Sequence, residues 1–136
     1  MYTYKARLDR VVDGDTIDAN IDLGFDITIH KRIRLTGIDT PESRTRDLEE
    51  KARGLAAKAR LIELLEKGDL VVESTEVGKF GRVLGTLHVY SEESGSINVN
   101  DTLVKEGHAV EYYGGKKKKK VEETKSDQNE DVPFAD

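Results

Sequence analysis

Residues 13–23 have the sequence DGDTIDANIDL, in which residues 16–23 alternate cleanly between apolar and polar side chains. The apolar positions are Ile17, Ala19, Ile21 and Leu23. This alternation predicts a half-buried β-strand whose polar residues, Asp18, Asn20 and Asp22, lie on a solvated face. The pair Asp13-Gly14 is a strong hairpin-turn signal, so an antiparallel strand is expected just before it.

Two further strands are expected around this one. Residues 2–12 alternate weakly, and residues 27–36 place four apolar residues in phase, namely Ile27, Ile29, Ile33 and Leu35. Gly24-Phe25-Asp26 provides the turn between the second strand and the third. Three antiparallel strands in succession predict a meander.

The pattern then becomes helical. Apolar residues recur at three- and four-residue spacing at Leu48, Ala52, Leu55, Ala59 and Ile62. Asp47 with Glu50 predicts a capping box at the start of this helix, and Gly68 suits its C′ position. Strands are expected over about 69–75 and 82–90, followed by a short helix that Asn98 caps and Gly107 ends.

The order of these elements predicts a mainly β fold with helices (α+β). Five short strands with one long helix after the third strand, and a short C-terminal helix, suit a Greek-key barrel of the OB-fold type. A four-stranded sheet with packed helices is the alternative that the pattern alone allows.

Composition excludes several classes of protein. The chain has 136 residues, no cysteine, 22 Lys+Arg and 27 Asp+Glu, which gives a net charge of −5. Disulfides, zinc-thiolate sites and cysteine nucleophiles are therefore excluded. No apolar run approaches the ~18 residues of a membrane span, and the first residues lack the apolar region of a signal peptide, so we expect an intracellular protein without a membrane partner. A negative chain is also not expected to bind nucleic acid by bulk charge alone.

The charge pattern divides the chain. Residues 1–115 carry the whole −5 (16 basic against 21 acidic residues), whereas the remainder has five consecutive lysines at 116–120 and then an acidic run. We predict a folded domain over 1–113 and a disordered tail over 114–136. The lysines are either a solvated run or a phosphate-binding arm.

The end of the tail carries a separate hypothesis. Its acidic run leading to Val132-Pro133-Phe134 is similar to the C-terminal tip of bacterial single-stranded-DNA-binding proteins, which docks replication and repair proteins. The alternative is an unspecific solubilising tail.

Two segments carry acids that suit metal binding. One is residues 12–16, at the turn into the second strand, and the other is residues 38–42, after the third strand. If the barrel brings them together, Asp15 and Asp39 supply the hard oxygen ligands that Ca²⁺ or Mg²⁺ prefers. Taken singly, each aspartate is equally explained as a turn or loop residue.

Arginines extend this site. Arg34 lies in the third strand, and Arg82 opens the fifth. Each alone is explained as a surface residue, but two guanidinium groups, a metal and Glu42 together have the chemistry of a phosphodiesterase. The cations would neutralise charge on phosphorus, and a carboxylate could activate water.

The segments at 13–16, 34–42 and 79–82 closely resemble those of the staphylococcal nuclease (thermonuclease) family, and the resemblance covers roughly residues 3–113. It implies an OB-fold barrel and a Ca²⁺-dependent endonuclease. The implied substrates are DNA and RNA, preferably single-stranded, with 3′-phosphate ends as products. We also expect a monomer. The alternative is a non-catalytic OB-fold module that binds nucleic acid or protein.

The resemblance also implies roles for individual residues. Asp15 and Asp39 match the calcium carboxylates, and Thr40 matches the residue whose backbone carbonyl binds the metal. Arg34 and Arg82 match the arginines that hold phosphate and stabilise the transition state.

Glu42 matches the carboxylate assigned as general base. Its presence together with the two arginines and both calcium carboxylates favours the enzyme over the binding module.

Substrate-binding residues are implied as well. Lys79 matches a lysine that contacts a nucleotide phosphate, and Phe80 stands where well-known members have tyrosine, so one hydroxyl contact is lost. Tyr113, or Tyr112 in the other register, matches the tyrosine beside the nucleotide, where stacking tolerates any base.

Overall fold

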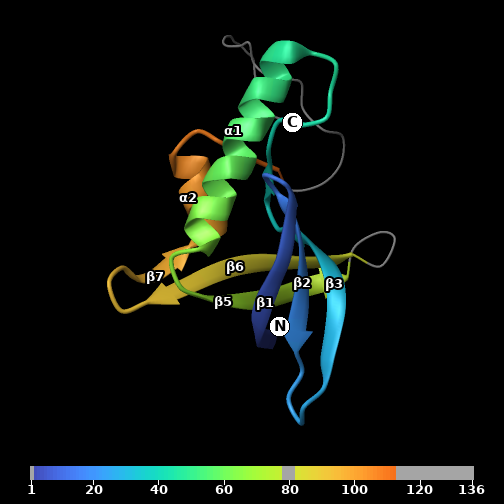
Figure 1. Cartoon of the computed structure of the whole chain (residues 1–136), viewed down its shortest axis with the longest axis vertical. Coiled ribbons are helices and arrows are strands. Elements are labelled where there is room, and N and C mark those ends of the chain that lie inside the picture. Colours follow the sequence, from blue (N-terminus) through green and yellow to red (C-terminus); the bar gives the residue numbers. More distant parts are fainter. Residues whose placement is uncertain (1, 78–81, 113–136) are drawn as a thin grey trace.

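The structure is a computed structural model that describes residues 2–77 and 82–112 (Figure 1). The elements are β1 (Tyr2–Asp13), β2 (Thr16–Asp22), β3 (Thr28–Leu35), β4 (Ile38–Asp39), α1 (Leu48–Leu65), β5 (Asp69–Val77), β6 (Val83–Ser91), β7 (Gly95–Asn98), α2 (Val99–Lys105) and β8 (Val110–Glu111). The predicted boundary at residue 113 and the tail over 114–136 lie outside the described residues.

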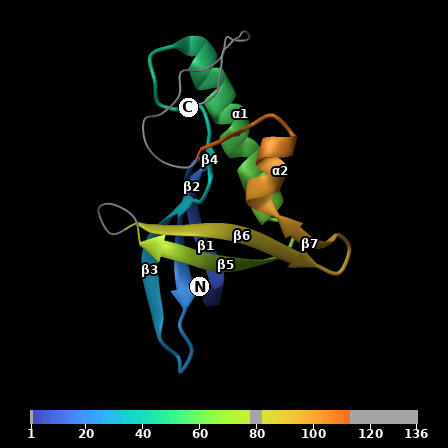
Figure 2. The same cartoon turned by 180° about the vertical axis from the view of Figure 1, so that it is seen from behind.

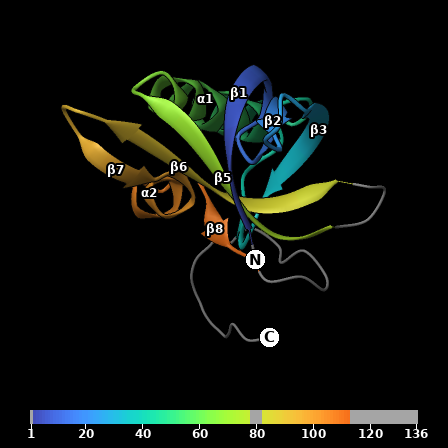
Figure 3. The same ribbon diagram turned by 90° about the horizontal axis from the view of Figure 1, so that it is seen from below.

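Five of the strands form a closed barrel. The main sheet has the order β3-β2-β1-β5-β6-β7, and β3 also pairs with β6 in parallel. This last pairing, which includes Ile33 with Val83 and Leu35 with Gly85, joins the two ends of the five-strand sheet. Figure 3 shows the strands curving round from β3 to β6. The predicted OB-fold type of barrel with two helices is therefore confirmed.

The core follows the alternation in β2. Ile17, Ala19 and Ile21 are at most 3% exposed, as the sequence pattern predicts. Leu23, the fourth apolar residue of that pattern, is 40% exposed, because β2 ends at Asp22 before it. The helices contribute fully buried leucines to the same core, among them Leu61 and Leu103. Figure 2 shows α2 lying beside α1, and Arg60 of α1 joins Glu106, the C-cap of α2, through two hydrogen bonds. In the described part of the chain, neither helix has the length and hydropathy needed to span a membrane.

Three short strands were not expected from the sequence. Strand β7 adds an edge strand that pairs antiparallel with the last four residues of β6, and it begins at Gly95, whose φ is +69°. Strands β4 and β8 form a two-residue ladder that joins Ile38 to Glu111 and Asp39 to Val110. Strands β4 and β8 are too short for a readable periodicity, because alternation needs about four residues to be recognised. Strand β7 has four residues, but Ile97 is its one large apolar residue, so no alternation is visible.

The long helix is confirmed, but of the five apolar residues whose spacing predicted it, only Ile62 packs against the core. Leu48 and Leu55 are 78% and 46% exposed, and Ala52 and Ala59 are exposed too. The buried positions are Gly54, Ala57, Leu61, Leu64 and Leu65. The first half of α1 extends past the barrel (Figure 1), so its contacts are with loop backbone and require small residues rather than leucines.

The caps of the two helices agree only in part with the sequence prediction. Asp47 caps α1 through the N–H groups of Glu49 and Glu50, and Asn98 caps α2. Gly107, with φ of +83°, follows α2 as expected.

The rest of the predicted capping box is absent in the described structure, because the Glu50 carboxylate accepts from the N–H of Glu42 instead. Gly68 is not in the left-handed region, and its small size is needed for another reason, since a Cβ there would lie 2.1 Å from the Tyr90 carbonyl oxygen.

Candidate active site

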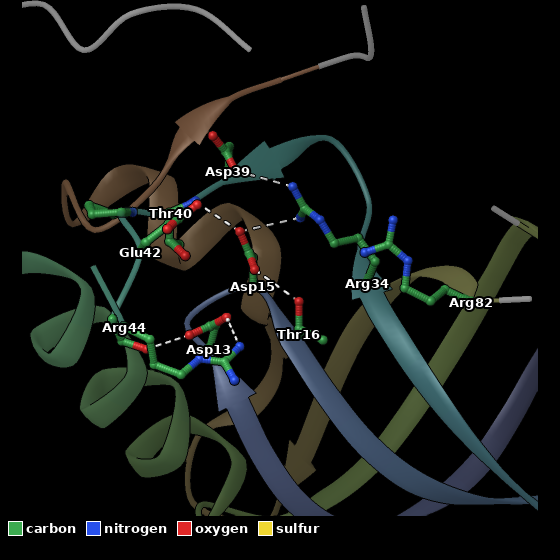
Figure 4. Close-up of a pocket in the computed structure, with 11 residues that line it drawn as sticks. Asp13, Asp15, Thr16, Arg34, Asp39, Thr40, Glu42, Arg44 and Arg82 are labelled. Carbon is green, nitrogen blue, oxygen red and sulfur yellow. Dashed lines mark hydrogen bonds and ion pairs between the residues drawn. The ribbon is translucent and has the colours of Figure 1, made fainter. Parts of the chain in front are cut away.

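One end of the barrel has a pocket of about 290 Å³ that is built from four separate segments (Figure 4). The segments are the β1–β2 turn, the end of β3, β4 with the loop after it, and the residue that precedes β6. The lining residues are Asp13, Asp15, Thr16, Arg34, Asp39, Thr40, Pro41, Glu42, Ser43, Arg44 and Arg82. The fold thus brings together the six predicted residues of the metal and catalytic sets.

Arg34 is the central cation of the pocket. Its guanidinium lies 3.5 Å from Asp15 and 3.2 Å from Asp39, and all three side chains are at most 16% exposed. Nη1 of Arg34 also donates to the backbone carbonyls of Leu35 and Ile38. Arg34 lies in β3 and Asp39 lies in β4. The sharp turn at Gly37 between these strands, with φ of +78°, brings the Asp39 carboxylate back to the Arg34 guanidinium.

Asp15 joins the two acidic segments. One carboxylate oxygen accepts from the Thr16 hydroxyl at 3.0 Å, and the other accepts from the backbone N–H of Thr40 at 3.0 Å. The Thr40 contact spans 25 positions in the sequence. It supports the prediction that residues 12–16 and 38–42 meet at one end of the barrel.

Glu42 is positioned through its backbone. Its N–H donates to the Glu50 carboxylate of α1 at 3.2 Å. Beneath it, Gly54 of α1 lies so close that a Cβ would be 2.4 Å from the Glu42 carbonyl oxygen. The next residues are held from the other side, because Ser43 donates to Asp13 and Arg44 forms an ion pair with Asp13 at 3.3 Å.

Two buried polar atoms at this pocket have no hydrogen-bond partner among the described residues. They are Nε of Arg82 and the hydroxyl of Thr40. A buried donor without a partner costs about 1–3 kcal/mol, so such atoms call for an explanation. Both belong to residues that line the pocket, where a bound oxygen could satisfy them.

The charges of the pocket fit an added cation. Its lining includes four acids (Asp13, Asp15, Asp39 and Glu42) and three arginines, so its net charge is −1. A phosphodiester would make the sum more negative, and a divalent ion would offset it. The available donors are oxygens, which suit Ca²⁺ or Mg²⁺. Within residues 2–77 and 82–112 no three acidic or histidine side chains converge as a metal cluster, so the ion would also need backbone or water oxygens.

The predicted nucleotide-binding residues are only partly described. Lys79, Phe80 and Tyr113 lie outside the described residues. Tyr112 does not line the pocket; its backbone N–H donates to the Gly37 carbonyl at 2.8 Å, beside the β4–β8 ladder. The place of either tyrosine beside a nucleotide stays a prediction.

Five residues of the lining were not predicted as members of the site. Asp13 was interpreted as a turn residue, and Thr16, Pro41, Ser43 and Arg44 were given no role in the chemistry. Their position in the sequence could have indicated them, since each lies within two residues of a predicted site residue.

Comparisons with known proteins agree with this geometry. The family model described as "Staphylococcal nuclease homologue" matches residues 32–131. The chain is 34% identical to micrococcal nuclease of Shigella flexneri over 117 residues, which are 82% of this chain and 61% of the relative. It is 33% identical to Protein ParB of Escherichia coli over 76% of this chain and 54% of that protein. It is 36% identical to Endonuclease YhcR of Bacillus subtilis over 81% of this chain and 9% of the relative.

The chain thus covers less than two thirds of each of these relatives. The family model nevertheless matches well over half of the chain, and the strands and turns that it covers carry Arg34, Asp39, Glu42 and Arg82. The chain therefore belongs to the staphylococcal nuclease homologue family.

Proposed function

We propose that this protein is an endonuclease that hydrolyses phosphodiester bonds of DNA and RNA with the help of one Ca²⁺ ion. The observation that carries the proposal is the pocket itself, where buried Asp15 and Asp39 face Arg34, and Arg82 has a buried donor without a partner among the described residues. Two of the relatives compared above have names that describe them as nucleases, which supports the same reaction.

Asp15, Asp39 and the backbone carbonyl of Thr40 would hold the ion. The fit rests on the donor set, because two buried carboxylates and a neighbouring main-chain oxygen offer only hard oxygen ligands. When bound, the ion supplies positive charge that offsets the negative charge developing on the phosphate.

The arginines would hold the phosphate. Arg34 approaches the pocket from β3 and Arg82 from the residue just before β6 (Figure 4). A guanidinium fork matches the geometry of two phosphate oxygens. A phosphate oxygen would satisfy Nε of Arg82, and the same contact would strengthen as charge accumulates in the transition state.

Glu42 would act as the general base. It would take a proton from a water molecule as the water oxygen bonds to phosphorus, and the bond from phosphorus to the 5′ oxygen would break. The 5′ oxygen takes up a proton, and the phosphate stays on the 3′ side. Lys79 would contact a neighbouring phosphate, while Phe80 and Tyr112 or Tyr113 would contact the nucleotide. Stacking on an aromatic ring needs an unpaired base, which favours single-stranded substrates.

The test is cleavage of labelled single-stranded DNA and RNA by the purified protein with Ca²⁺, Mg²⁺ or chelator. We expect cleavage with Ca²⁺, none in chelator, and products that a polymerase extends only after phosphatase treatment. Arg34→Ala should abolish cleavage, whereas Lys67→Ala, an exposed lysine beyond the end of α1, should not affect it. Cleavage by Arg34→Ala at the rate of the unmodified protein would refute the assignment, and binding without cleavage would indicate the binding module.

A further inference from the structure

A second cluster of arginines lies on the outer face of the barrel. Residues 17, 19 and 21 of β2 point into the core, so Asp18 points outward. Its partner in the β1 ladder is Arg10, and its partner in the β3 ladder is Arg32. The three residues form one line across three strands, which we name the Arg10–Asp18–Arg32 row.

The row is built around a buried carboxylate. Arg10 donates from Nε to Asp18 at 3.0 Å, and Arg32 donates from Nε and Nη2 at 2.8 and 3.1 Å. The Asp18 side chain is 7% exposed, whereas those of Arg10 and Arg32 are 64% and 44% exposed. The hydrogen bond from Arg32, with the help of Arg10, lowers the pKa of Asp18 to about 2, so the carboxylate stays charged and the arginines stay oriented.

Both arginines keep donors free for a ligand. In the described part of the structure, Nη1 and Nη2 of Arg10 and Nη1 of Arg32 donate no hydrogen bond. Two cations against one buried anion give the row a net charge of +1, in a chain whose net charge is −5. An oriented pair of exposed guanidinium groups is suited to phosphate.

The row adjoins the pocket. Arg34 lies two residues after Arg32 on the same face of β3, a step of about 6.6 Å along a strand. Thr16, the ladder partner of Arg34, lies two residues before Asp18 on β2. A polymer whose scissile phosphate is held by Arg34 therefore has a neighbouring phosphate within reach of Arg32 and Arg10.

We propose that the Arg10–Asp18–Arg32 row is a second phosphate-binding site, which holds the backbone of the nucleic-acid strand next to the scissile phosphate. The inference rests on the proposed nuclease function for its choice of ligand. It differs from a role in which the row only joins three strands, because it requires an effect of the arginines on binding.

The test measures binding without cleavage. Anisotropy of fluorescein-labelled oligo(dT) is followed in chelator, with the full chain, between 50 and 200 mM salt (approximate working range). Arg10→Gln and Arg32→Gln should each weaken binding about fivefold near 0.1 M salt and lower the salt slope by about 0.7, the value for one phosphate contact with a single strand. Lys67→Gln removes the same charge from an exposed site away from the row and should leave the slope unchanged.

Further variants keep the result interpretable. Arg10→Lys keeps the positive charge and should retain most of the affinity for oligo(dT). A role that only joins the strands makes no such prediction about affinity. Equal salt slopes for the Arg10→Gln, Arg32→Gln and unmodified proteins, or no measurable binding by the unmodified protein, would overturn the second site. If the two glutamine variants have the expected lower salt slopes but the unmodified protein does not cleave in the nuclease assay, only the proposed reaction is overturned.

Discussion

Replacement of Gly54 by alanine tests how α1 positions Glu42. The new Cβ would lie 2.4 Å from the Glu42 carbonyl oxygen and 2.7 Å from the Ser43 nitrogen, whereas ordinary contacts begin at 3.4 Å. The difference between 3.4 and 2.4 Å requires a movement of about 1 Å. The loop should move rather than the helix, because α1 is fixed by buried Ala57, Leu61 and Leu64.

The expected effect is on catalysis more than on stability. A displacement of about 1 Å at a reacting group costs roughly a hundredfold in rate. In contrast, alanine in place of glycine within a helix contributes about 1 kcal/mol of stability, which offsets the cost of moving the loop. Gly54→Ala should therefore lower kcat about a hundredfold while the melting temperature changes by only a few degrees.

The assay is steady-state cleavage of single-stranded DNA with Ca²⁺, together with thermal unfolding. Gly68→Ala is the matched control, since its Cβ would meet the Tyr90 carbonyl oxygen at 2.1 Å, in a turn that does not line the pocket. That variant should lose stability but keep its activity per folded molecule. If Gly54→Ala is folded and cleaves within about twofold of the unmodified protein, the proposed dependence of Glu42 on α1 is wrong.

Three further predictions concern contacts that do not involve Glu42. Gly14→Ala should impair stability and metal affinity, because its Cβ would lie 2.8 Å from that of Ala57 and 3.0 Å from the Thr40 hydroxyl; Ala57→Gly in the same chain should partly restore stability in urea unfolding. The lowered pKa of Asp18, from 3.8 to about 2, stabilises the fold above pH 3.8, and this contribution is lost as the pH falls through about 2. Asp18→Asn should therefore cost about 1 kcal/mol at pH 7, after allowance for solvent screening of the exposed arginines, and only a small part of that near pH 2. An equal difference at both pH values would contradict this. Glu106→Gln should lower stability by about 0.5–1 kcal/mol by weakening the bond to Arg60 between the helices, and a double-mutant cycle with Arg60→Gln measures that coupling.

The sequence predicted the barrel strands because alternation of buried and exposed residues is visible within a single strand. Ile17, Ala19 and Ile21 alternate over a complete strand, and one buried face requires that alternation. Asp47 and Asn98 cap the helices through contacts within three residues, so their roles are also visible in the sequence.

Contacts between segments that are distant in the sequence could not be predicted from local patterns. The apolar positions of α1 predicted a helix but did not reveal its buried face, because loop backbone against Gly54 replaces a layer of leucines there. Asp18 was expected on a solvated face, yet it is 5% exposed under arginines that lie 8 and 14 positions away in the sequence. Glu50 was expected to complete a capping box, and it instead holds the backbone of Glu42.

The site residues could be predicted from their sequence motifs, but the contacts among them could not. Asp15 and Asp39 lie in short segments that each resemble the family, and the residue types alone indicated oxygen ligands and phosphate-binding arginines. The contacts of Asp13 with Ser43 and Arg44 span about 30 positions, and only the fold reveals them.

The most direct test of the proposed chemistry is the single-turnover rate of DNA cleavage by Glu42→Gln with saturating Ca²⁺. Glu92→Gln, an exposed residue in the β6–β7 turn, removes the same charge without touching the pocket. Loss of a general base should slow cleavage at least about a hundredfold in Glu42→Gln, with unchanged binding of the substrate, while Glu92→Gln cleaves normally. Equal cleavage rates for the two variants would contradict the account.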